Sequence, residues 1–376
     1  MPASFATPLP QSPRSDILEW RFPKPYHNLT LTGRSRAAWH TSFVIPQLNL
    51  LLDAGRVINH LRPKHIFLTH GHSDHTLLTP VFVKRSDPPD IYCPAEMKDA
   101  LDSFINAETM LNEGGGIWPP ESTSPYLQKY TSNKKGPEPP PSGPDAGDGD
   151  GAPRGDPSPS PAEADVTMED GQINSSAAAE QQQEARENND NHDNENDDAD
   201  DGIHPLLRTH RTHGLRPGDT VKLRRLAAPQ TYTATAFACD HTVPCLGYVF
   251  SAVTPKLRPE YRGLPGPELR ALREERGVDL TAPVAVPVFA FLGDTTASVL
   301  AAGPEWLFLW DEHRDQAART RHTIWADLEP VVRRHPDTVF VLTHFSLRYS
   351  DEDVRAFFRR RDVPENVVVW VDGAGE

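Results

Sequence analysis

The stretch "KHIFLTHGHSDHTLLT" (64–79) joins a short apolar strand pattern to a dense group of polar residues. Within it, His70-Gly71-His72-Ser73-Asp74-His75 places four good metal ligands within six residues. Two imidazoles two positions apart can chelate one ion from a tight loop, and the Asp-His pair that follows can face a second ion. The stretch therefore predicts a metal-binding loop at the end of a strand. The alternative interpretation is a solvated polar turn.

Three further polar residues follow apolar, strand-like runs later in the chain. His241 follows "TATAFACD", Asp294 follows "VPVFAFLG" and His344 follows "VFVLT". Each one alone is typical of an ordinary strand end. Together they could supply the ligands that a dinuclear site needs beyond the first loop, and an aspartate between two zinc ions can bridge them. We therefore expect Asp294 to take the bridging position.

The surrounding pattern predicts a layered α/β domain, because strand-like runs alternate with helical ones in both halves of the chain. The longest apolar run, 282–293, contains two prolines and is interpreted as a buried strand with its approach. The segment "GPELRALREERGV" is expected to form a helix closed by Gly277. A further helix is expected at "DEHRDQAARTR", and the remaining strands include 29–33, 41–46 and 48–55.

Charge is distributed unevenly along the 376 residues. The net charge is −15, but the segment 131–202 alone holds 19 acidic and 4 basic residues, so the remainder is formally neutral. The negative total therefore does not exclude a nucleic-acid partner. The segment has no aromatic residue and is rich in Pro, Gly, Ser, Asn and Gln, which predicts a disordered insert. It is expected to be either a passive surface insertion or a competitor of a polyanion for a basic site.

The other sequence features bound the class of protein. The three cysteines, Cys93, Cys239 and Cys245, lack the spacing of a disulfide scaffold, which favours a reducing compartment. We see neither a signal peptide nor an apolar run long enough to cross a membrane. We therefore expect a cytoplasmic or nuclear protein without a membrane partner.

The motif set resembles the metallo-β-lactamase superfamily and, within it, the short form of the ribonuclease Z family of tRNA 3′-processing endoribonucleases. The resemblance covers nearly all of the chain outside 131–202. It implies a four-layer αββα sandwich with two Zn²⁺ ions, whose halves would be 1–130 and 203–376. The motifs that carry it are the His70–His75 loop, "DHTVPCLGYVF" (240–250), "FLGDTT" (291–296), "RHT" (321–323) and "LTHFSLRY" (342–349).

The same resemblance assigns roles to individual residues. His70, His72 and His241 would hold one zinc, Asp74, His75 and His344 would hold the other, and Asp294 would bridge them. Asp74 occupies the position of the general base. His322 would donate a proton to the leaving oxygen or stabilise the transition state, with Glu305 as its partner. Alternatively, Glu305 is a surface glutamate beside Trp306, and the segment before it is shorter than the family usually has.

A basic arm for tRNA is expected at 254–280, where the family places one. The alternative is an amphipathic surface helix whose glutamates balance the charge. A second basic cluster, 204–225, could bind phosphate or pair with its acidic neighbour. The basic residues of the expected arm are Lys256, Arg258, Arg262, Arg270, Arg273 and Arg276.

The expected function is therefore removal of the 3′ trailer from precursor tRNA, or action on another RNA, by a zinc-dependent phosphodiesterase. Two rivals remain. One is another hydrolase on this fold, acting on a cyclic nucleotide, thioester or lactone. The other is a catalytically impaired metal-binding scaffold. Family members often form dimers, so a homodimer is compatible with the resemblance.

Overall fold

The computed structural model describes residues 4–9, 16–114, 204–226, 230–296, 299, 321–360 and 362–373. The predicted insert 131–202, Glu305 and most of the expected helix 311–321 lie outside these residues, so the expectations about them stay predictions. Residues Met1–Thr131 and Gly202–Glu376 group into one compact unit. Within the described ranges, no helix has the length and apolar character needed to span a bilayer.

Ten strands of the described ranges form one mixed sheet in the order β13-β14-β1-β2-β3-β4-β5-β6-β7-β8. Its centre, from β1 to β5, is antiparallel, and the pairs at both ends are parallel. The bounds are β1 Ser4–Pro8, β2 Leu18–Arg21, β3 Thr30–Arg36, β4 His40–Ile45, β5 Leu50–Leu52, β6 His65–Phe67, β7 Asp90–Pro94, β8 Arg211–Leu215, β13 Phe340–Leu342 and β14 Val367–Asp372.

Four described strands form a second, antiparallel sheet in the order β12-β11-β10-β9. They are β9 Thr220–Leu223, β10 Thr231–Ala238, β11 Leu246–Leu257 and β12 Thr281–Phe291. The strand predicted from the apolar run 282–293 forms, but the expectation that it is buried was wrong, because every residue of β12 is at least partly exposed. The reason is its position at the sheet edge, which is also where prolines such as Pro283 and Pro287 are tolerated.

The main core lies between the two sheets. Side chains alternate along the strands of the large sheet, as a period of two requires. Leu50, Leu52 and Phe67 belong to the cluster that includes residues of β10 and β11, whereas Leu51 and Ile66 belong to the cluster beneath helix α2. The helices of this half are α1 Ser73–Thr76 and α2 Lys98–Asn112, with 3₁₀ turns η1 Pro46–Leu48, η2 Thr79–Phe82, η3 Ala95–Met97 and η4 Pro205–Leu207.

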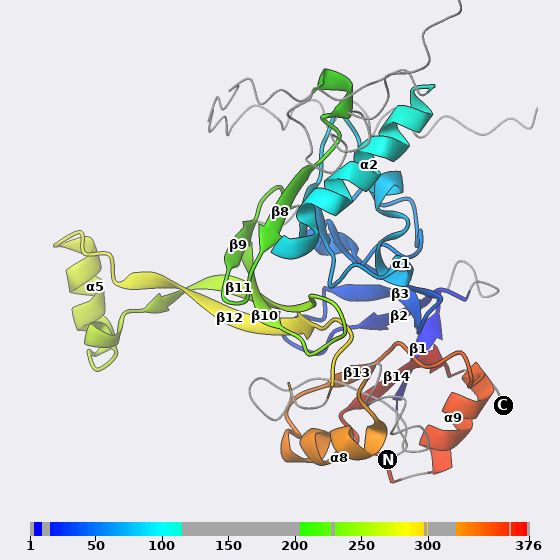
Figure 1. Cartoon of the computed structure of the whole chain (residues 1–376). Helices are drawn as coiled ribbons and strands as arrows, with labels where there is room; N and C mark the ends of the chain where they lie inside the picture. Colours follow the sequence, from blue (N-terminus) through cyan, green and yellow to red (C-terminus); the bar gives the residue numbers. More distant parts are fainter. Residues whose placement is uncertain are drawn as a thin grey trace, which may run out of the picture. The chain divides into compact units, whose positions relative to one another are not determined.

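Two further helices form a second helical layer. Helices α8 (Trp325–Arg334) and α9 (Asp351–Arg360) pack with β13 and β14 in one apolar cluster. Phe237 of β10 and Ala290 of β12 pack against the same cluster from the outer face of the small sheet. Helices therefore lie outside both sheets, and the predicted αββα sandwich is confirmed (Figure 1).

Strands β11 and β12 extend beyond the rest of the small sheet as a two-stranded hairpin. The pairing of β10 with β11 ends at Val253, but β11 and β12 remain paired as far as Leu257 and Thr281. The 3₁₀ turn η5 (Pro259–Tyr261) and helix α5 (Gly266–Glu274) form the connection at the end of the hairpin (Figure 1). Gly277 follows α5 with φ of +62°, as its expected helix-closing role requires.

Candidate metal centre

The first loop of the centre begins where β6 ends. His70 is fully buried, His72 precedes the short helix α1, and Asp74 and His75 lie within that helix. The Thr76 hydroxyl donates to the His72 carbonyl at 3.0 Å and tightens the turn. Four potential ligands that are close in sequence are thus held on a compact, rigid element.

A glycine on the neighbouring strand end makes room for this loop. An added Cβ at Gly55 would lie 1.9 Å from the Asp74 carbonyl oxygen, so a larger residue cannot fit without moving the loop. The Ala54 amide donates to the His75 carbonyl at 2.6 Å, and the Leu78 amide donates to the Ala54 carbonyl. The segment "DAG" after β5 therefore positions the loop of candidate ligands through backbone contacts.

Three histidines and one carboxylate form the first group. His72 Nδ1 is 3.0 Å from His70 Nε2 and 3.3 Å from His241 Nε2. Asp294 Oδ2 lies 3.8 Å from His70 Nε2 and 3.9 Å from His241 Nε2. His241 comes from the β10–β11 connection and Asp294 from the end of β12, so the fold brings together candidate ligands from three separate segments.

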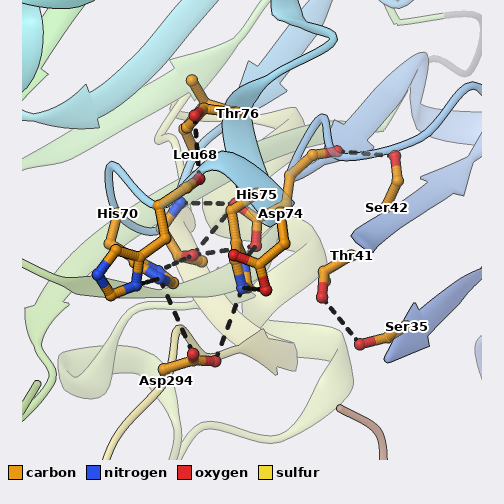
Figure 2. A network of polar contacts seen from close by, with 12 residues as sticks. Ser35, Thr41, Ser42, Leu68, His70, Asp74, His75, Thr76 and Asp294 are labelled. Atoms are coloured by element: carbon orange, nitrogen blue, oxygen red, sulfur yellow. Dashed lines mark hydrogen bonds and ion pairs between the residues drawn. The ribbon is translucent and has the colours of Figure 1, made fainter. Parts of the chain in front are cut away.

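The second group consists of Asp74, His75 and His344, and it borders on the same aspartate. His75 Nε2 is 3.6 Å from Asp74 Oδ2 and 3.8 Å from Asp294 Oδ1. His344 Nε2 is 3.2 Å from Asp294 Oδ2. Figure 2 shows the two Asp294 oxygens directed toward His70 on one side and His75 on the other. Asp294 therefore lies between the two groups, where a bridging residue is expected.

Several histidines of the centre use Nδ1 for a contact behind them and direct Nε2 inward. This arrangement selects the tautomer whose Nε2 lone pair can bind a metal ion. His75 Nε2 is buried and has no hydrogen-bond partner among the described residues, which is the state expected of an atom that binds an ion. The pairs behind the centre are His70 with Thr69 Oγ1 at 3.0 Å, His75 with Asp53 Oδ2 at 2.7 Å and His344 with Thr41 Oγ1 at 2.9 Å.

Asp53 was missed by the sequence reasoning and is the central supporting residue. It is fully buried and has a φ of +54°. Besides His75, it accepts the backbone N–H of Thr69 at 2.8 Å and the Thr69 hydroxyl. The sequence did contain a signal for Asp53, because this residue follows the apolar run of β5 just as the candidate ligands follow their own strands. Nothing in the sequence separates a residue that contacts a metal from one that contacts its ligand.

The electrostatics of the centre suit cations. Burial lowers the pKa of His70 well below its ordinary value and lowers that of His241 to about 4, so both rings are neutral. Burial raises the pKa of Asp294, but the charges of His344 and His75 outweigh it and hold this carboxyl ionised. Burial lowers the pKa of His75, whereas Asp53 and Asp294 raise it, with a result of about 9. A proton and a metal ion thus compete for His75 Nε2.

His322 reaches the centre from the loop before α8. Its Nε2 is 3.1 Å from Asp294 Oδ2, and its side chain is 26% exposed, more than those of His75 and His344. A small cavity of about 40 Å³ is lined by His75, Asp294, His322 and His344. His322 is thus placed on the open side of the two groups. Its expected partner Glu305 lies outside the described residues.

A buried arginine supports the turn that carries His344. His344 has a φ of +61°. Arg36 of β3 donates to the Ser346 and Tyr349 carbonyls and forms an ion pair with Asp351 at 3.1 Å. These contacts tie the end of β13 to the start of α9, so the strained His344 backbone is held from both sides. The sequence contained no signal for this role.

The two basic regions differ in their surroundings. Helix α5 lies within the described residues, and each of its side chains is at least partly exposed. This exposure agrees both with a tRNA-binding arm and with an amphipathic surface helix. In the cluster 204–225, Arg225 forms ion pairs with Asp87 at 2.9 Å and Asp90 at 3.1 Å. Part of that cluster therefore pairs with acidic residues of the folded domain.

An αββα sandwich with candidate His and Asp ligands at the strand ends is typical of the metallo-β-lactamase class. Residues 54–221 match the family described as the metallo-beta-lactamase superfamily. The chain is 30% identical to "tRNase Z TRZ2, chloroplastic" of Arabidopsis thaliana over 41% of its own length and 49% of the relative's. It is 29% identical to "tRNase Z TRZ1" of the same plant over 39% of its own length and 54% of the relative's.

The chain thus spans about half the length of the curated relatives it matches. Among solved structures, the short form of human tRNase Z aligns over 90% of this chain and 95% of its own, with 16% identity and a TM-score of 0.38. The metallo-β-lactamase fold protein YhfI from Bacillus subtilis aligns over the same shares, with 9% identity and a TM-score of 0.39.

Proposed function

We propose that the chain is a zinc-dependent endoribonuclease that removes the 3′ trailer from precursor tRNA. The observation that carries this proposal is the convergence of seven side chains into two groups with Asp294 between them. Two adjacent cations suit phosphodiester hydrolysis, because both the attacking and the leaving oxygen need charge stabilisation. The tRNase Z relatives favour tRNA as the RNA.

The residues present fit two divalent ions of the zinc type, since zinc prefers imidazole and carboxylate donors. When bound, zinc ions lower the pKa of coordinated water and stabilise negative charge on the phosphate. His70, His72 and His241 would hold one ion, Asp74, His75 and His344 would hold the other, and Asp294 would contact both.

Asp74 and His322 are the groups that we assign to proton transfer. The Asp74 side chain is 13% exposed and lies 3.6 Å from His75 Nε2, so its carboxylate is available to hold the proton of the attacking water. The hydrogen bond of His322 Nε2 to Asp294 orients the ring, and its partial exposure lets it donate a proton to the leaving 3′ oxygen. Glu305 remains the proposed partner of His322.

The hairpin that carries α5 is proposed to bind the tRNA backbone. Phosphates are recognised by exposed arginine and lysine side chains, and α5 with its flanking segment offers several of them. Residues 254–280 hold six basic and five acidic side chains, so the formal net charge of this segment is +1. A homodimer, a cytoplasmic or nuclear location, and the division into 1–130, 131–202 and 203–376 also remain proposals.

Cleavage of precursor tRNA by Asp74→Ala tests the function. We expect the variant to lose at least about 10³-fold in rate while its circular dichroism stays that of the wild type, because it loses both a ligand and the proton acceptor. The matched control is Asp99→Ala, an exposed carboxylate on α2 that should leave the rate unchanged.

The substrate set separates the rival functions. A cut at the start of the 3′ trailer supports the proposal. Hydrolysis of small phosphate or carboxylate esters without RNA cleavage would indicate another hydrolase of this fold. Stoichiometric zinc without any hydrolysis would indicate a scaffold protein, and full activity of Asp74→Ala would refute the assignment of the site.

A further inference from the structure

Cys239 and Cys245 lie opposite each other at the base of the loop that carries His241. The β10–β11 pairing runs in register to Ala238 and Leu246, and the Cys239 amide donates to the Cys245 carbonyl at 3.0 Å. Cys239 and Cys245 are the next facing positions after Ala238 and Leu246, and facing residues of an antiparallel pair have Cα atoms about 4.5–5.5 Å apart. That separation is common across a disulfide.

The two thiols differ in their access to solvent. Cys239 is partly exposed, whereas Cys245 is buried. Both line a cavity of about 410 Å³ whose walls also include Glu96 and Pro217. A small oxidant in this cavity would meet Cys239 first, with Cys245 next to it as the thiol that completes a disulfide.

Cys245 also connects this pair to the metal centre. Its Sγ donates to the Asp294 backbone carbonyl at 3.4 Å. An added Cβ at Gly293 would lie 2.3 Å from the same sulfur, so the thiol packs directly on the backbone before Asp294. A bond between the two sulfurs would enclose His241 within a short covalent loop. It would also remove the proton that Cys245 donates toward Asp294.

We propose that Cys239 and Cys245 form a reversible dithiol–disulfide pair that responds to hydrogen peroxide and controls how firmly the centre retains its metal. The Cys239 sulfur attacks one peroxide oxygen, the O–O bond breaks, and a sulfenic acid and water form. The Cys245 sulfur then attacks the Cys239 sulfur, the S–O bond breaks and a second water leaves. Two thiols are oxidised to one disulfide, and one peroxide is reduced to two waters.

The test uses the full chain loaded with zinc and treated with hydrogen peroxide. We expect an intact mass lower by two hydrogens, a peptide cross-linked between Cys239 and Cys245, and reversal by dithiothreitol. Zinc transfer to a chelator should become about 10-fold faster, the scale on which contacts behind a metal ligand act. RNA cleavage should fall by a similar factor, a readout that rests on the proposed function.

Two variants decide the outcome. Cys93→Ala removes the buried third thiol and should keep the whole response, whereas Cys239→Ser should abolish the cross-link and the peroxide effect on zinc transfer. A cross-link that involves Cys93, or oxidation of Cys239 without any cross-link, would overturn the proposal. Unchanged zinc transfer in the cross-linked protein would overturn its control of the centre. The mass and zinc readouts hold even if the chain does not cleave RNA, so the two proposals can fail separately.

Discussion

Replacing Asp53 with asparagine tests how the fold prepares His75 for a metal ion. The wild-type carboxylate accepts the His75 Nδ1 proton at 2.7 Å and two hydrogen bonds from Thr69. Asparagine has nearly the same shape, and its oxygen can still accept from Thr69. Its NH₂ group then faces His75 Nδ1 and favours the tautomer that carries its proton on Nε2. That proton occupies the atom directed at Asp74 and Asp294.

The expected magnitude follows from this change of tautomer and charge. Loss of a carboxylate behind a metal-bound histidine weakens metal affinity about 10–100-fold, or about 1.4–2.7 kcal/mol. Loss of a charge-assisted, buried hydrogen bond should lower the free energy of unfolding of the metal-free protein by about 1–3 kcal/mol. Only one of the two groups contains His75, so one of the two proposed zinc ions should be affected far more than the other.

Competition with a chromophoric chelator measures both zinc affinities, and urea denaturation measures stability. Asp99→Asn is the control, because that carboxylate is exposed on α2. If Asp53→Asn binds both ions as tightly as the wild type does, His75 is not prepared by Asp53 and the reasoning is wrong. Equal weakening of both ions would instead point to a general loss of structure.

Two further predictions follow from packing and charge. In Gly55→Ala the new Cβ would lie 1.9 Å from the Asp74 carbonyl oxygen and should displace the loop. We expect the free energy of unfolding in urea to fall by about 2 kcal/mol or more, and zinc binding to weaken. The control is Gly71→Ala, whose Cβ meets nothing within 4 Å and which should be nearly neutral; equal effects of the two variants would refute the steric argument. Burial raises the pKa of Asp102, but hydrogen bonds from His210 and neighbouring donors lower it to about 2. Because this pKa lies below its unfolded value, the carboxylate stabilises the fold above about pH 4. About 2 kcal/mol of the free energy of unfolding is lost as the pH falls toward about 2. In urea unfolding at a series of pH values, Asp102→Asn should lack this part of the acid dependence.

The candidate metal ligands could be predicted from the sequence for a specific reason. His70, His72, Asp74 and His75 are close together in the chain, so their spacing alone constrains them to one small volume. His241, Asp294 and His344 each follow an apolar strand. Strand ends of a packed sandwich meet at a shared edge, so a polar residue at each end predicts a common site. The structure brings all seven together.

The sequence pattern was less informative where burial depends on a strand's neighbours. The run 282–293 is as apolar as a central strand, yet β12 lies at the edge of its sheet. Its prolines agree with the edge position, but only the strand order decides which face remains open. The hydrophobicity of a segment shows that a strand can be buried, whereas its actual exposure depends on the elements that pack beside it.

Local spacing and composition were enough to predict the class of fold, the seven candidate ligands and the separation of an acidic segment from a neutral remainder. The residues that support the candidate ligands follow instead from contacts in the folded protein. Asp53 behind His75, Thr41 behind His344 and the two opposed cysteines at the base of the His241 loop are contacts between distant or ordinary-looking positions. Such contacts arise from strand register and sheet packing, which no single stretch of sequence encodes.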